Sequence, residues 1–420
     1  MKRLLRKVAG VFVATAMVAA MGVTTLAADE TENINGNNNV VGNNDPADAV
    51  KKKLVIEKEL TAYNPEEIEI YAPNITYTYT IAGSDDEAGK KITDTHGTSA
   101  KTVAGPSGAS ITSSISWTNT EKINASSAGI ANKKELTIDL SGINFQAAGV
   151  YRYKITETCS DTDKAAASVT EGTIAQVRYL DVYVRDPKAG TTETGFQIYG
   201  YVLFENNNDI NANSVDSADD SVKKAVKTEG FVATTGPDGS TLSADSYYTY
   251  NVSVTKKLEN DSANSTHEFP FQIDFAKAAS GNFNLVASDT TDPVAMATSI
   301  NRKIADGNSV KFSGIPCGTT VDIIETNDIT TVAYKVTTTG ADTNITDKLV
   351  NGNETTGDDA VVINSTAGQS GEFKKVTFTN TLELISPTGV AMAVLPFVIL
   401  LGFGVCFMVV STTKRSEEQA

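Results

Sequence analysis

The sequence predicts an all-β protein, and three observations support this class. Short runs of alternating apolar and polar residues recur along the chain, and they are rich in β-branched and aromatic residues. Gly, Asn, Asp and Ser fill the gaps between these runs, and no long window has a convincing helical periodicity. The chain has 420 residues, which is enough for more than one β-sandwich.

The two ends of the chain carry targeting signals. Residues 1–28 combine a basic start, an apolar stretch and small residues at the end, which predicts a cleaved signal peptide. Residues 29–50 are polar and rich in Asn, so we expect a flexible leader. Residues 390–410 contain no charge and are long enough for a transmembrane helix, and a basic tail follows them. The protein is therefore expected to be exported and tethered.

The exported region divides into two sets of predicted strands. The first set lies within residues 51–235 and includes the alternating runs at 75–81 and 150–155. The turn-rich residues 236–240 (GPDGS) form a predicted linker. The second set lies within residues 241–383. Each set has the strand number and spacing of a small β-sandwich.

Composition excludes several functional classes. The chain has 51 acidic and 35 basic residues and a net charge of -16, which argues against nucleic-acid binding. Its 2 histidines belong to no metal-binding or nucleophile motif, so we expect no enzyme with turnover, no metal and no cofactor. Its 3 cysteines are too few for a disulfide scaffold.

Lysine, glutamate and asparagine recur at corresponding strands. The opening strands of the two halves contain Lys58 and Lys256. Later strands end in Glu157 and Glu325, and the last strand of the second half contains Asn380. If the first and last strands are neighbours, lysine and asparagine can face each other in the core beneath a glutamate of the opposite sheet.

Such an arrangement has a definite chemistry. Burial favours a neutral lysine amine and a protonated glutamate. The amine can attack the asparagine side-chain carbonyl while the glutamate shuttles protons, so that ammonia leaves and an isopeptide bond remains. The alternative is that these residues are ordinary solvated side chains on strand edges, where Lys and Glu are common.

Four segments resemble the backbone pilins of sortase-assembled Gram-positive pili, of the streptococcal T-antigen (FctA-like) type. They are residues 148–157 (AGVYRYKITE), 254–258 (VTKKL), 313–319 (SGIPCGT) and 376–381 (VTFTNT). The resemblance implies two tandem immunoglobulin-like (CnaB-type) β-sandwiches: a pilin isopeptide linkage domain at residues 51–235 and a second, isopeptide-containing domain at residues 241–383.

The resemblance also implies roles for individual residues. In the second domain Lys256 is the nucleophile, Asn380 the electrophile and Glu325 the proton shuttle. Lys257 is a less favoured nucleophile, because adjacent strand residues face opposite ways. In the first domain the corresponding lysine and glutamate are Lys58 and Glu157.

The asparagine of the first domain is open to two alignments. Asn206 is slightly preferred, because residues 202–206 (VLFEN) have the form of a closing strand that ends in Asn. In the competing alignment residues 227–232 form the closing strand. Ala233 then stands where an asparagine is expected, and no bond can form.

Residues 384–420 resemble a cell-wall sorting signal. Ser386, Pro387, Thr388 and Gly389 precede the apolar run, although the motif departs from the common L-P-x-T-G form. The resemblance implies that a pilin-specific sortase cleaves between Thr388 and Gly389 and joins Thr388 to a lysine of the next subunit. Lys227 is the preferred acceptor lysine, and Lys188 is the alternative. A chance Pro-Thr-Gly before an ordinary membrane anchor is the competing interpretation.

The predicted function is therefore a structural one. We expect the backbone subunit of a covalently polymerised, cell-wall-anchored pilus at the cell surface. The expected partners are the sortase, identical pilin subunits in a head-to-tail polymer, peptidoglycan and host surface ligands. The alternative is a singly wall-anchored adhesin or stalk protein of the same fold.

Overall fold

The computed structural model describes residues 31–33, 52–83, 89, 91–93, 99–207, 226–235, 241–259, 268–277, 282–296, 299–326, 334–341, 350–351, 361–369 and 371–384. The predicted signal peptide, nearly all of the leader, the sorting motif and the apolar run 390–410 lie outside these ranges. In the described ranges, no helix combines the length and the apolar character that a membrane crossing requires.

The described residues are mostly β-strands, as the sequence predicts. A single short helix among them, α1 (Asp161–Ala166), was not expected from the sequence. Ser160 caps it by accepting a hydrogen bond from the backbone N–H of Asp163. Alternation explains the strands well: in β4 (Ile75–Gly83) the first residues alternate between buried and exposed, as in a strand with one face on a core.

The strands of the N-terminal part form two main sheets. One contains β1 (Thr31–Asn33), β2 (Lys53–Tyr63), β8 (Ser110–Ile111), β11 (Ile130–Asp139), β13 (Val169–Thr170) and β16 (Gly230–Phe231). The other has the order β15-β14-β12-β4-β9, with β7 also paired to β12. Its strands besides β4 are β7 (Val103–Ala104), β9 (Ser114–Trp117), β12 (Gly149–Thr158), β14 (Val177–Arg185) and β15 (Gln197–Phe204).

Three strand pairs accompany these sheets. They are β3 (Ile68–Tyr71) with β10 (Lys122–Ala125), β5 (Lys91–Thr93) with β6 (Ser99–Lys101), and β17 (Thr234–Thr235) with β18 (Thr241–Leu242). The last pair matters for the site below, because it lies between β16 and the next long strand in the chain.

The C-terminal part also has two sheets, and the first of them is continuous with the β2-containing sheet of the N-terminal part, so that together they form one 13-stranded sheet. One contains β19 (Asp245–Glu259), β21 (Asn284–Ala287), β22 (Val294–Ala295), β24 (Ser309–Pro316), β26 (Tyr334–Ala341), β27 (Val350–Asn351) and β29 (Phe373–Leu384). The other has the order β23-β20-β25-β28 and consists of β20 (Glu268–Lys277), β23 (Ile300–Ala305), β25 (Thr319–Glu325) and β28 (Val361–Ile363).

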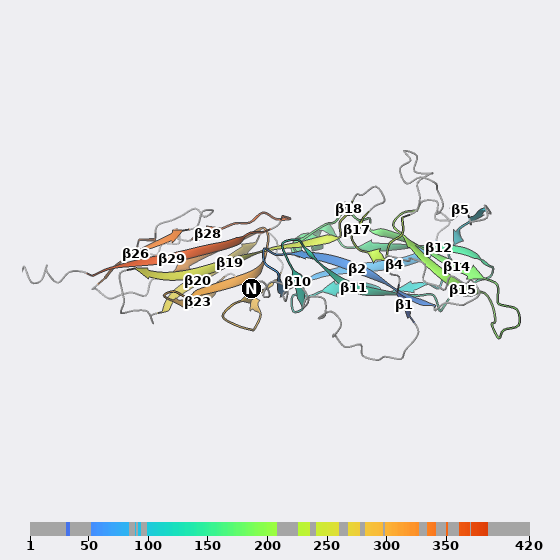
Figure 1. Cartoon of the computed structure of the whole chain (residues 1–420), viewed down its shortest axis with the longest axis horizontal. Helices are drawn as coiled ribbons and strands as arrows, with labels where there is room; N and C mark the ends of the chain where they lie inside the picture. The colour runs from blue at the N-terminus through green and yellow to red at the C-terminus, as the bar shows by residue number, and fades with distance from the viewer. Residues whose placement is uncertain are drawn as a thin grey trace, which may run out of the picture.

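Two large apolar clusters fill the space within these pairs of sheets. The first core draws on strands from β2 to the start of β19, and includes Trp117, Tyr153 and Phe231. The second core draws on the rest of β19 and later strands, and includes Phe271 and Phe378. Figure 1 shows the two groups of strands lying end to end along the longest axis.

Strand β19 connects the two cores without interruption. Its first residues, Asp245 to Tyr248, pair in parallel with β2. Its later residues pair with β24 on one side and with β29 on the other. Tyr247 belongs to the first core and Tyr250 to the second, so β19 changes from one core to the other over this short distance.

Candidate functional site

In the C-terminal part, a lysine and a glutamate meet inside the core. Lys256 on β19 is 0% exposed, and its Nζ lies 3.1 Å from Oε2 of Glu325. Glu325 is the last residue of β25, in the opposite sheet, and is also buried. The Nζ atom lies 4.4 Å from the centre of the Phe269 ring. The neighbouring Lys257 is exposed, so alternation selects Lys256 as the inward lysine.

The environment of Lys256 lowers the pKa of its ammonium group. Burial lowers the pKa of the Lys256 ammonium to about 8, although the charges of Glu325 and Asp306 act in the opposite direction. A lysine with this pKa is neutral for part of the time near neutral pH. It is therefore a better nucleophile than a solvated lysine.

The third predicted residue of this site, Asn380, lies on the strand next to Lys256. Strand β29 runs parallel to β19, with Phe378 opposite Lys256 and Asn380 opposite Leu258. The opening and closing strands of this part are therefore neighbours, which is the arrangement that the proposed chemistry needs. The description of Asn380 extends to its backbone position only.

The N-terminal part contains a second buried lysine–glutamate pair, formed by Lys58 and Glu157. Lys58 on β2 is 0% exposed, and its Nζ donates to Oε1 of Glu157 on β12 at 2.8 Å. The hydroxyl of Tyr79 donates to the other oxygen of Glu157, Oε2, at 2.8 Å. Tyr77 lies beneath the ammonium, with its ring centre 4.1 Å from Nζ. Both predicted pairs are thus brought together, each beside an aromatic ring.

The structure does not bring Asn206 to Lys58. Asn206 follows β15, and β15 pairs with β14 in the sheet opposite β2. At Lys58, β2 pairs with β11 on one side and with β16 on the other, where Phe231 lies opposite Lys58 in parallel register. The preferred alignment is therefore corrected in favour of the competing one, because residues 202–206 belong to the wrong sheet to serve as the closing strand.

Sequence reasoning missed Asp245, which takes the place beside Lys58. Its Oδ2 lies 3.3 Å from Nζ of Lys58, and the residue is 3% exposed. The chain leaves the edge of β2 after β16, forms the β17–β18 pair, and returns to the same edge at Asp245. One signal in the sequence was available: Asp245 lies two residues before the aromatic run 247–250 (YYTY).

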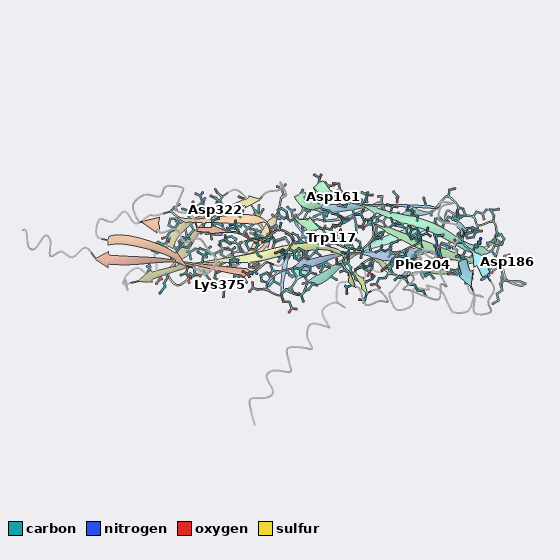
Figure 2. The ribbon with its side chains drawn as sticks, turned by 90° about the horizontal axis from the view of Figure 1, so that it is seen from above. Trp117, Asp161, Asp186, Phe204, Asp322 and Lys375 are labelled. Atoms are coloured by element: carbon teal, nitrogen blue, oxygen red, sulfur yellow. The ribbon has the colours of Figure 1, made fainter. Side chains whose placement is uncertain are left out.

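The predicted acceptor lysines are both exposed. Lys227 forms an isolated bridge with Phe204, at the end of β15. Lys188 lies between β14 and β15, and its backbone N–H donates to Glu193. Figure 2 shows Asp186, two positions before Lys188, at the tip of the molecule opposite the half that contains Asp322 and Lys375. Ser386, Pro387, Thr388 and Gly389 lie outside the described residues.

Comparison with known proteins finds a matching family model and a curated relative. Residues 250–381 match a family described as a domain of unknown function, DUF7601. The chain is 27% identical over 294 residues to a curated protein named Pilin from Streptococcus pyogenes serotype M1, over 68% of this chain and 72% of that protein.

Two solved major pilin structures from Streptococcus pyogenes are also similar. The T3.2 protein is 19% identical with a TM-score of 0.40, over 82% of this chain and 100% of that one. The T-13 protein is 17% identical with a TM-score of 0.37, over 82% and 99%. The resemblance to streptococcal pilins that the sequence motifs indicate is confirmed by the curated relative.

Proposed function

We propose that this chain is the backbone subunit of a covalently polymerised pilus on the surface of a Gram-positive bacterium. It would consist of two tandem immunoglobulin-like sandwiches that meet within β19. The exported subunit would be anchored through the sorting signal at residues 384–420. It would perform no turnover, because each of its reactions occurs once per molecule.

The observation that carries this proposal is the same in both cores. A fully buried lysine lies beside a glutamate that comes from the opposite sheet. Such pairs are costly in a purely structural role, because removing two charges from water often outweighs their attraction. A self-crosslinking reaction gives the pairs a chemical role, since it converts the buried lysine into a neutral amide while the glutamate transfers protons.

In the second core the reaction would join Lys256 to Asn380. The amine of Lys256 would attack the side-chain carbonyl of Asn380, and Glu325 would carry a proton from the amine to the leaving ammonia. The parallel pairing of β19 with β29 supports this assignment. Strands that are held together in this way keep reactants at a high effective concentration.

Such a bond would suit a fibre under tension. A sandwich held by noncovalent forces is stabilised by only about 5–15 kcal/mol. A covalent tie between the first and last strands would carry a pulling force that otherwise falls on sheet hydrogen bonds. Polymerisation would then join Thr388 of one subunit to Lys227, or to Lys188, of the next.

Expression of the full chain in a Gram-positive host, with and without its pilin sortase, tests the proposal. We expect a ladder of high-molecular-weight species on denaturing gels only when the sortase is present. Replacement of Thr388 with Ala is expected to abolish the ladder. A single band in the presence of active sortase would contradict polymerisation and would favour a singly anchored adhesin.

A further inference from the structure

Asp245 is held in a site made of several elements. Its Oδ2 faces Lys58, and its Oδ1 accepts a hydrogen bond of 2.8 Å from the backbone N–H of Gly172. Nζ of the buried Lys164, on α1, lies 3.9 Å from Oδ1. The carboxyl group thus has the Lys58 amine at one oxygen, and the Gly172 N–H donor and the charge of Lys164 at the other.

The strand register gives Asp245 the same place in the first core that Asn380 has in the second. Asp245 on β19 lies opposite Leu60, two residues after Lys58 on the parallel strand β2. Asn380 on β29 lies opposite Leu258, two residues after Lys256 on the parallel strand β19. In both cases the glutamate comes from the facing sheet. Asp245 therefore stands where the second core has its proposed electrophile.

We propose that Lys58 and Asp245 condense into an isopeptide bond, so that the first core is crosslinked with release of water. This inference rests on the proposed self-crosslinking function and assigns its residues in the first core. The ammonium of Lys58 and the carboxylate of Asp245 become one amide and one water. Two of the three Nζ protons and the Oδ2 atom form that water, while Glu157 ends in the state in which it began.

The positions of the neighbours suit the individual steps. Glu157 lies 2.8 Å from Nζ, so it can take a proton from the amine and deliver it to the departing oxygen. The Gly172 N–H faces Oδ1, where negative charge develops when Nζ attacks Cγ. Oδ1 would then remain as the carbonyl oxygen of the amide. Tyr79 holds Glu157 through its second oxygen.

The backbone approach at Gly172 is close enough to require glycine. A Cβ atom at this position would lie 2.2 Å from the carbonyl oxygen of Ser243. This contact allows the Gly172 N–H to reach Asp245 from the neighbouring segment. The absence of a side chain at Gly172 therefore lets its N–H donate to Oδ1 of Asp245.

Exclusion of water favours the condensation. Lys58, Glu157 and Asp245 are all buried, so little water is present to reverse the reaction. Reactants held in a near-attack geometry reach effective concentrations of about 10⁵–10⁸ M. Lys164 is the less suitable nucleophile, because it is farther from Asp245 and its Nζ bonds Glu171 at 3.0 Å.

Intact-mass measurement of the mature, denatured protein tests the assignment. The two crosslinks leave different signatures, since Lys256–Asn380 releases ammonia and Lys58–Asp245 releases water. We expect both losses in the unaltered chain, and a linked peptide pair containing Lys58 and Asp245 after digestion. Lys58→Ala, Asp245→Ala and Glu157→Ala should each abolish the water loss completely and leave the ammonia loss, which shows that the second core of the variant still folds.

Two further variants sharpen the test. Asp245→Asn should replace the water loss with a second ammonia loss, because the leaving group changes. Lys134→Ala is the matched control: Lys134 lies opposite Lys58 in the β2–β11 register but bonds Glu121, so both losses should persist.

A chain that loses ammonia but no water would overturn the inference and leave the proposed function intact. A chain that loses water but no ammonia would instead contradict the Lys256–Asn380 bond. A water loss that persists in Lys58→Ala and disappears in Lys164→Ala would overturn the choice of nucleophile.

Discussion

Asp245 and Lys256 are both buried on the single strand β19, and each lies in a different core of the protein. The odd-numbered Asp245 and Tyr247 face the first core, whereas the even-numbered Val254 and Lys256 face the second. One strand therefore presents the proposed electrophile of one crosslink and the nucleophile of the other. In the proposed arrangement of two sandwiches, β19 is both the last strand of the first and the first strand of the second.

Replacing Glu325 with Ala should prevent the crosslink in the second core. Without a proton shuttle, we expect no ammonia loss by intact mass. We also expect the free energy of unfolding to fall by about 3–5 kcal/mol, by analogy with a disulfide that closes a long loop. Urea unfolding of the same samples measures this difference.

Glu268 provides the matched control for that experiment. It lies on β20, in the same sheet as Glu325, but its side chain is exposed. Glu268→Ala should retain the ammonia loss and nearly all of the stability. An ammonia loss that survives in Glu325→Ala would show that another group moves the proton.

The pKa of Lys256 predicts a pH dependence for a chain that lacks the crosslink. In Asn380→Ala, Lys256 stays a free amine with a folded-state pKa of about 8, against about 10.4 for an unfolded lysine. Above about pH 8 the unfolded state binds more protons, so stability should rise with pH up to about 10. The full rise is on the order of 3 kcal/mol. Chemical denaturation at intervals between about pH 7 and 9.5 measures most of it.

The double variant Lys256→Met with Asn380→Ala controls for other titrating groups. It should lack the component of the rise that belongs to Lys256. The crosslinked chain should lack it too, because an amide nitrogen does not titrate in this range. Equal pH profiles for the single and double variants would contradict the lowered pKa.

The acceptor lysine can be identified by substitution. In a host with active sortase, Lys227→Ala should eliminate the polymer ladder, because no amine remains to release the subunit from the enzyme. Lys188→Ala should leave the ladder unchanged. Both residues are exposed, so neither change is expected to affect folding. If only Lys188→Ala removes the ladder, the acceptor is Lys188, in the loop between β14 and β15, and not Lys227.

A buried amide pair at the junction of the cores should contribute to their joint stability. Asn64, which follows β2, and Asn251 on β19 exchange hydrogen bonds of 2.8 and 3.0 Å. Asn251 also donates to Glu66 at 2.6 Å. Asn251→Ala would remove these three hydrogen bonds, although Asn64 keeps Thr249 and Glu66 keeps Lys311 as partners. We expect a loss of about 1–3 kcal/mol in the free energy of unfolding.

A double-mutant cycle with Asn64→Ala measures the coupling in that pair. The combined loss should be smaller than the sum of the two single losses, since each variant removes the same contacts. Additive losses would mean that the two amides act independently.

The sequence was sufficient to predict the strands and the residues of the two buried lysine–glutamate pairs. Alternation in residues 75–81 correctly predicted β4, and alternation likewise separated the buried Lys256 from the exposed Lys257. The four residues of the two pairs were predicted from the order of the strands and from the resemblance to pilins. Their proximity depends on opening strands that face glutamate-bearing strands across a core, which a sandwich provides.

Asp245 could not be found in the same way, because its role depends on register between distant segments. The residues between β16 and β19 resemble a linker in the sequence, yet the chain returns after them to the edge of β2. The closing strand of the first core is therefore split. A linear motif search looks for an asparagine at the end of a continuous apolar run. Such a search selects Asn206 after residues 202–205, or finds Ala233 after residues 227–232.

The continuity of β19 also bears on how the subunit responds to stretching. An extended strand rises about 3.3 Å per residue, close to the maximum that a polypeptide can reach. The segment of β19 between the cores is therefore already close to full extension, and a pulling force cannot lengthen it much further. A fibre of such subunits would be inextensible within each repeat, and its bending and elasticity would reside at the joints between neighbouring copies.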